Sequence, residues 1–318
     1  MTAEYNDEAD GPAGKAVLLP VWNKPEPYFQ ILDKLRPIVP PSKNPWRVVP
    51  DDKRAQTHRL ARTRECLVAV HPKAIVIGSP YGRDRRGGLG WFGVIFMACV
   101  SFVFASNGFG AIFSEDRDLI FAAFALVFSF LFMLIAVAFF NYAKRMPSDW
   151  PIMFNRENRT VTIIRPARPR FFKFWKFTDS GVFAYAWDDV RVRSYKAIVS
   201  NAGKSFHESY YLVMLWGGED ESGRKVAKEC IPVGYFGYFE DERLFQVWEH
   251  IRRYMEEGGP PIQPGERLRK PVNDRKPMEF PPAVIAAAGG PALSVAEVER
   301  LAGVVSEAQR ETNSVESA

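Results

Sequence analysis

The chain has 318 residues, of which 47% are hydrophobic and 14% aromatic, so it carries enough apolar material for one or two domains with cores. Its three cysteines, Cys66, Cys99 and Cys230, lack C-x-x-C spacing, which argues against a disulfide framework or a zinc knuckle and suits a reducing compartment. The formal net charge of +5 is small for this length and comes without a zinc-finger, RRM-type or helix-turn-helix signature, so no nucleic-acid partner is expected.

Residues 1–64 are predicted to form a cytoplasmic N-terminal segment that is partly irregular. Its first ten residues are acidic and lack an apolar core, so a cleaved signal peptide is not expected. Prolines punctuate residues 20–50, where only a short helix near residues 28–35 is predicted. Residues 65–82 then indicate a strand pair turning at His71-Pro72-Lys73, and the pattern leaves open whether this pair joins the sheet predicted further along the chain.

Two uncharged apolar stretches follow, at residues 89–113 and 119–143. Each exceeds the roughly 20 helical residues that cross a hydrocarbon core of about 30 Å. Neither stretch has a polar face, and the rest of the chain is too short to bury such a hairpin in a protein core. Both are therefore predicted to be transmembrane helices, joined by the net acidic loop 114–118 and surrounded by a lipid bilayer.

Basic residues flank this hairpin on the sides away from its loop. Arg83, Arg85 and Arg86 precede the first span, and Lys144 and Arg145 follow the second. By the positive-inside rule both termini are cytoplasmic, which predicts a multi-pass protein of the bacterial inner (cytoplasmic) membrane.

The composition of the spans favours an anchor over a channel, because neither contains a charged residue or a histidine. Small residues recur at helical spacing in both spans and predict close packing within the hairpin rather than between copies: Ala98, Ser101, Ala105, Gly108, Ala122, Ala125 and Ser129.

Residues 150–258 are predicted to form a cytoplasmic β domain. Strand candidates separated by turn residues lie at 151–155, 160–165, 170–177, 182–187, 190–195, 210–216 and 225–232. A helix over residues 241–257, with Asp241 as a candidate N-cap, closes the domain because its apolar residues, Trp248 among them, form one stripe. The predicted fold class is thus an α+β membrane protein whose two-helix hairpin is inserted into, or precedes, an antiparallel β domain closed by an amphipathic helix.

The remaining chain is predicted to be a proline-rich linker over residues 259–292, a short helix over 293–311 and a disordered tail over 312–318. Ser294 and Glu297 have the spacing of a capping box, which opens that helix.

Several short strands followed by one amphipathic helix resemble a pleckstrin-homology-like fold. The two spans, together with Pro151-Ile-Met-Phe-Asn-Arg156, Arg159, Val161 and Ala186-Trp-Asp188, resemble a bacterial domain-of-unknown-function family of two-span membrane proteins. Members of that family are often found near type VI secretion and toxin gene clusters. The resemblance covers roughly residues 65–258 and implies no known activity and no functional residues.

No catalytic set, metal site or cofactor site is apparent, so a non-enzymatic protein without cofactors is expected. The four histidines, His58, His71, His207 and His250, form no H-x-x-x-H or H-E-x-x-H pair. Asp188 and Asp189 are adjacent, and adjacent strand residues point to opposite faces, so a turn or capping role is favoured over acid/base chemistry.

The most distinctive segment is residues 165–177, where basic and aromatic side chains interleave soon after the second span. Its candidate lipid or partner surface consists of Arg165, Arg168, Arg170, Lys173, Trp175 and Lys176. Basic residues near an anionic leaflet each contribute on the order of 1 kcal/mol, which favours contact with anionic lipid head groups. The alternative is an ordinary strand with its aromatic residues inward.

Two functional classes therefore stay open. The first is an anchored domain that binds a protein partner, as an immunity or accessory factor linked to type VI secretion. The second is a membrane-surface scaffold whose pleckstrin-homology-like domain reads lipid head groups.

Overall fold

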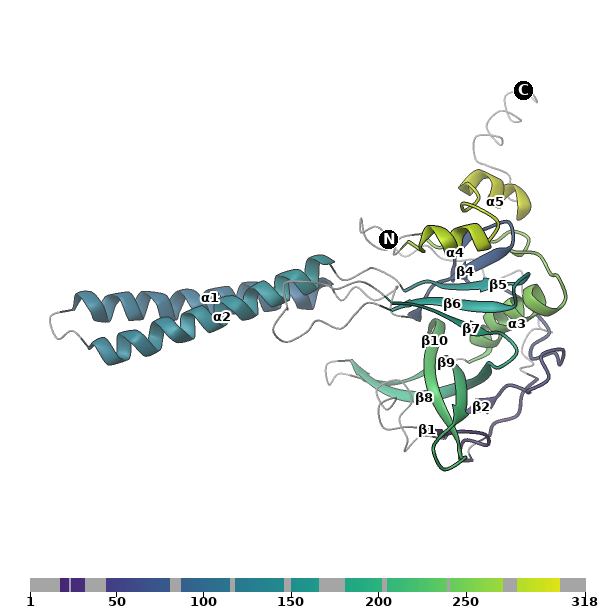
Figure 1. The fold of residues 1–318 in the computed structure, drawn as a ribbon, viewed down its shortest axis with the longest axis horizontal. Coiled ribbons are helices and arrows are strands. Elements are labelled where there is room, and N and C mark those ends of the chain that lie inside the picture. The colour runs from purple at the N-terminus through teal and green to yellow at the C-terminus, as the bar shows by residue number, and fades with distance from the viewer. Residues whose placement is uncertain are drawn as a thin grey trace, which may run out of the picture. The chain divides into compact units, whose positions relative to one another are not determined.

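The computed structural model describes residues 18–22, 24–31, 44–80, 87–114, 118–145, 150–165, 181–201, 205–238, 241–270 and 279–303. The chain divides into two compact units. We call one unit the body, which comprises the described residues before 84, from 150 to 164 and after 181. The second unit contains the helical hairpin (Figure 1).

The first sheet of the body contains five strands in the order β3-β4-β5-β6-β7. Their bounds are Leu67–Val70, Ala74–Ile77, Ile152–Asn155, Thr160–Arg165 and Gly181–Ala186. β4 pairs antiparallel with β5, with Ile75 opposite Phe154, although the whole hairpin separates the two strands in the chain. The strand pair before the spans therefore joins the sheet after them, and the hairpin is an insertion between two neighbouring strands.

The second sheet has the order β1-β10-β9-β8-β2. Its strands are β1 (Gln30–Ile31), β2 (Arg47–Val48), β8 (Arg191–Asn201), β9 (Ser205–Glu219) and β10 (Lys225–Tyr238). The last three are the predicted strands at 190–195, 210–216 and 225–232, each longer than expected. The short helix expected near residues 28–35 is absent from the described part of that segment, where residues 30 and 31 pair with β10 instead.

One core lies between the two sheets and the helix α3 (Glu242–Glu256). Alternate residues of β9, Tyr210, Leu212, Met214 and Trp216, enter this core, whereas Tyr211, Val213 and Leu215 enter a smaller core on the other face. The predicted apolar stripe of α3 is confirmed, because Trp248 is 2% exposed and stacks on Trp187 with ring centroids 5.4 Å apart. Asp241 precedes α3 but does not cap it, since its carboxylate accepts hydrogen bonds from Trp46 and Arg47 instead.

The outer face of the second sheet is covered by residues 24–31. Phe29 lies directly over Gly217, where an added Cβ would come within 1.8 Å of the Phe29 ring. Glu26 accepts hydrogen bonds from Nε and Nη2 of Arg193, a side chain that is 1% exposed. A buried ion pair at this distance in sequence holds the proline-punctuated segment against the sheet.

The outer face of the first sheet is covered by residues close to the C-terminus. The helix α4 (Pro282–Ala287) lies within this cover, and Phe280 and Ala288 pack on Val76 and Met153. Residues 279–292, expected to belong to a linker, are therefore part of the body. The capping box at Ser294 and Glu297 is confirmed, and it opens α5 (Val295–Leu301), which is shorter than the predicted helix. Residues 304–318, including the predicted disordered tail, lie outside the described part.

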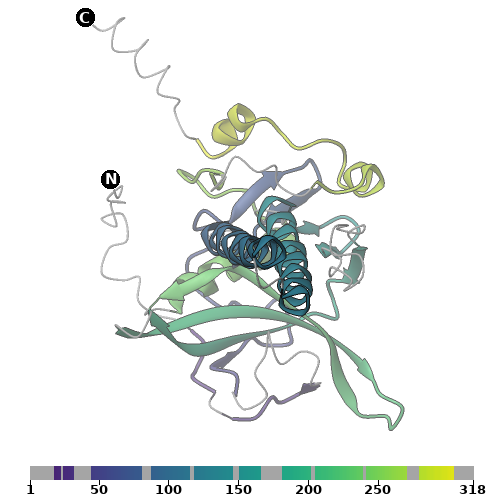
Figure 2. The ribbon, with the colours of Figure 1, turned by 90° about the vertical axis from the view of Figure 1, so that its left-hand side faces the viewer.

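The hairpin consists of α1 (Gly87–Phe113) and α2 (Leu119–Arg145), close to the bounds predicted for the two spans. Figure 2 shows the two helices side by side and nearly end-on. Within the loop between them, residues 115–117 lie outside the described part.

Candidate functional site

Most of the hairpin surface is apolar and exposed. Phe102 is 72% exposed in α1, and Ile120 is 73% exposed in α2. In a soluble protein such a surface is far larger than the apolar patches that monomers leave uncovered. Both helices are long and apolar enough to span a membrane.

Small residues form the contact between the two helices, as predicted. Ser101, Gly108, Ala122 and Ala125 are buried at this contact, while Ala98, Ala105 and Ser129 are partly buried. Two reciprocal hydrogen bonds join the helices: Ser101 Oγ donates to the Ser129 carbonyl over 2.8 Å, and Ser129 Oγ to the Ser101 carbonyl over 2.9 Å. A Cβ at Gly108 would lie 3.1 Å from Leu126, so glycine permits this close approach.

The predicted lipid or partner surface falls almost wholly outside the described residues. Arg165 is the last residue of β6, and its side chain is not described. The other members, Arg168, Arg170, Lys173, Trp175 and Lys176, lie in the undescribed range 166–180, as does the predicted strand 170–177. The surface stays a prediction from sequence.

Within the body, the segments that carried the family resemblance converge on Trp187. Phe154 of β5 meets the Trp187 ring edge-on, with centroids 6.1 Å apart, and the Trp187 backbone N–H donates to the Arg159 carbonyl over 2.9 Å. Trp187 Nε1 donates to Glu256 Oε1 at the end of α3. Segments of β5, the β5–β6 turn, β7 and α3 are thus tied together by one fully buried indole.

Arg159 is a basic residue among the side chains around Trp187. Its φ of +49° is rare for a residue with a Cβ, and its guanidinium bonds both Asp188, at 2.5 Å, and Glu256, at 2.8 Å. The hydrogen bond from Arg159 holds the pKa of Asp188 below its usual value. Asp188 thus lies in a turn, where its carboxylate is paired with Arg159.

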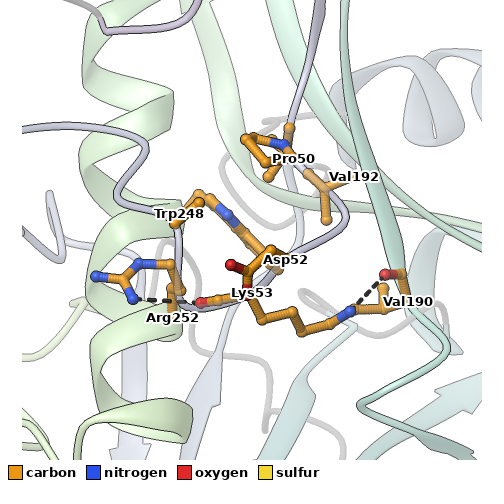
Figure 3. Close-up of a pocket in the computed structure, with 9 residues that line it drawn as sticks. Pro50, Asp52, Lys53, Val190, Val192, Trp248 and Arg252 are labelled. Carbon is orange, nitrogen blue, oxygen red and sulfur yellow. Dashed lines mark hydrogen bonds between the residues drawn. The ribbon is translucent and has the colours of Figure 1, made fainter.

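A cavity of about 10 Å³ lies between residues 49–55, the start of β8 and α3. Figure 3 shows the residues that line it. Lys53 Nζ donates to the Val190 carbonyl over 2.9 Å, and Arg252 Nη1 donates to the Lys53 carbonyl over 3.2 Å. Both cations are thus used to hold the segment 49–55 in place. A space of this size is at the lower limit for one water molecule, which is too small for a substrate or a cofactor.

The described histidine side chains have structural partners. His58 Nδ1 lies 2.9 Å from the Leu60 carbonyl, His71 Nδ1 lies 2.9 Å from the Gly290 carbonyl, and His250 Nδ1 lies 3.1 Å from Gln263 Nε2. The side chain of His207 is not described. Across the described ranges, no three His, Cys, Asp or Glu side chains gather as metal ligands would.

Sequence reasoning missed three residues that organise the body. Glu26, Lys53 and Glu256 bind partners in other parts of the chain, 69 or more residues away. No motif marks them, because each lies among ordinary surface-like charges in the sequence.

Residues 129–280, from the middle of α2 to the start of the C-terminal cover, match a family described as a family of unknown function (DUF6708). This range includes the segments 151–161 and 186–188, on which the resemblance in sequence partly rested, but it omits the first span and the start of the second. No curated protein and no solved structure matches the chain with significant similarity. Over this range the chain is therefore similar to a family of unknown function (DUF6708), and it has two helices that are able to span a membrane.

Proposed function

We propose that this protein is a two-span membrane protein of the bacterial inner membrane that acts by binding, with its body on the cytoplasmic side. The observation that carries the proposal is the exposed apolar surface of α1 and α2, which would be unstable in water. The insertion of the hairpin between β4 and β5 also supports it. Only residues 78–86 and 146–151 connect the hairpin to those strands, so the body has a short reach from the bilayer.

The positive-inside rule predicts that both termini are cytoplasmic, because the basic residues flank the hairpin and the connecting loop is net acidic. Reporter enzymes that are active only outside the cytoplasm should be silent when fused after residue 318 or before residue 1. The same reporter inserted in the loop at residue 116 should be active. Activity at either terminus would contradict this topology.

The described part of the body favours a binding function over an enzymatic one. Its charged side chains near the cavity are engaged in ion pairs and backbone contacts, and the core is covered on both outer faces. We infer that the body, whose two mostly antiparallel sheets and closing helix resemble a pleckstrin-homology-like fold, binds a protein partner. The resemblance to proteins encoded near secretion clusters suggests an immunity or accessory factor linked to type VI secretion. Turnover by the purified protein would contradict the proposal.

Lipid recognition is the second candidate, and the interleaved basic and aromatic residues 165–177 favour it. We expect Lys173→Glu combined with Lys176→Glu to lower the amount of anionic lipid that co-purifies with the full chain. The matched control is Lys225→Glu with Lys228→Glu, which reverses two charges on β10. Added salt should act in the same direction as the first pair of substitutions, because exposed charges are screened. Equal lipid retention by all three proteins would remove the lipid candidate.

A further inference from the structure

Asn107 is a polar residue on the exposed face of α1. Ser101 and Gly108 are buried against α2, whereas Val103, Asn107 and Gly110 are exposed. At about 100° per residue, these exposed positions lie on the side of α1 that faces away from α2. The span Trp91–Phe113 is centred near Phe102, so Asn107 lies roughly 7 Å from the middle of the bilayer in the proposed arrangement. This depth is well within the hydrocarbon core.

The amide of Asn107 has two N–H donors and one carbonyl acceptor. Nδ2 donates to the Val103 carbonyl over 2.8 Å. Among the residues that the structure describes, the second N–H and Oδ1 have no partner. An amide group left unpaired in hydrocarbon is costly, so this side chain favours any arrangement that supplies one more donor and one more acceptor.

The other polar side chains of the described hairpin do not have this need. Ser106 Oγ donates to the Phe102 carbonyl over 2.9 Å, and Ser101 and Ser129 bond each other. In α2, every exposed position between residues 119 and 140 is apolar. Among the hairpin side chains that the structure describes, Asn107 is therefore the group with donors and acceptors left to attract a second hairpin.

We propose that the hairpin binds a second copy of this chain through α1, with the Asn107 amides of the two copies hydrogen-bonded to each other. The inference rests on the proposed membrane insertion. Two copies inserted with the same orientation present Asn107 at the same depth, and an amide is complementary to itself across a two-fold axis. A polar partner in another protein would need to match that depth independently, which makes a second copy the favoured occupant.

The surroundings of Asn107 suit a contact between the α1 helices of two copies, which we call the seam. Val103, Asn107, Gly110 and Ser114 are spaced four, three and four residues apart, which is the heptad spacing of a helix–helix contact. A Cβ added at Gly110 meets nothing within 4 Å, so the backbone of a second helix has room to approach. A single asparagine in such a seam sets register and pairing.

The test uses the full chain reconstituted in proteoliposomes and energy transfer between two dye-labelled populations at several lipid-to-protein ratios. Asn107→Leu should weaken self-association about tenfold, the effect expected for one hydrogen-bonded amide contact in a membrane. Asn107→Gln keeps the amide and should stay near the wild-type value. Ser106→Ala is the matched control, because it removes a neighbouring exposed polar group that is already bonded within its own helix.

A second measurement locates the contact. In a Cys99→Ala background, Gly110→Cys should form a disulfide between copies, and Val127→Cys on the exposed face of α2 should not. Monomers at every lipid ratio, or an Asn107→Leu protein that associates like wild type, would overturn the inference. Retention of the wild-type chain in membranes after a carbonate wash is measured alongside. If the wash removes the chain from the membrane, the proposed function is contradicted. If the chain stays in the membrane as a monomer, only the proposed contact between two copies is contradicted.

Discussion

Replacing Trp248 by alanine should lower the free energy of unfolding of the body by about 3–5 kcal/mol, the range for a deleted core aromatic side chain. The indole is 2% exposed and stacks on Trp187, which itself ties several segments to Glu256. Trp248 Nε1 has no hydrogen-bond partner among the described residues, so the loss is one of packing. The cavity beside it would grow, because Trp248 already lines that space.

The free energy can be measured on the full chain in detergent by the urea dependence of thiol labelling. Cys66 and Cys230 are 1% and 2% exposed and react only when the body opens, and Cys99→Ala removes the exposed thiol of α1. Trp91→Ala is the matched control, since Trp91 is 44% exposed and lies in α1. Equal urea midpoints for the Trp248 and Trp91 variants would show that Trp248 does not support the core.

The second large effect is a loss of stability in mild acid that depends on His250. Burial lowers the pKa of this imidazole from 6.5 to about 4, and its Nδ1 lies beside Gln263 rather than a carboxylate. Between these two pKa values the unfolded chain binds a proton that the folded chain does not. Stability therefore falls as the pH drops from about 6.5 to about 4, by roughly 3 kcal/mol in total for this group.

His250→Gln should remove this contribution and leave a shallower dependence of the free energy of unfolding on pH in that interval. The comparison is made between slopes, because the substitution also changes packing at every pH. The buried Glu249 and the partly buried Glu256 have pKa values that their arginine partners lower despite desolvation, and they contribute equally to both proteins. Parallel curves for the wild type and the variant would refute the assignment to His250.

The elements predicted well are those whose cause is local. The uncharged stretches, the apolar stripe that places Trp248 inward and the capping box at Ser294 each depend on residues within one element. The small residues that line the contact between α1 and α2 belong to the same class, because a short loop leaves few other ways to arrange the two helices.

For Asp241 and for residues 279–292, the local sequence allowed more than one structural role, and contacts with distant residues determined which one each adopts. Asp241 has the residue type and position of an N-cap, yet Trp46 and Arg47 bind its carboxylate, because a distant segment reaches it in the folded body. Proline content made residues 279–292 look like a linker, although Phe280 and Ala288 cover a sheet face that would otherwise be exposed.

The sequence by itself thus determined the two apolar helices, the strand-rich body and the inward face of its closing helix, since hydrophobic periodicity is a local property. Only the tertiary structure decided that β4 pairs with β5 across the inserted hairpin and that Phe29 lies over Gly217. It also decided that Glu26 neutralises the buried Arg193. These contacts join residues far apart in the chain, and they form because each sheet has two apolar faces that must both be covered.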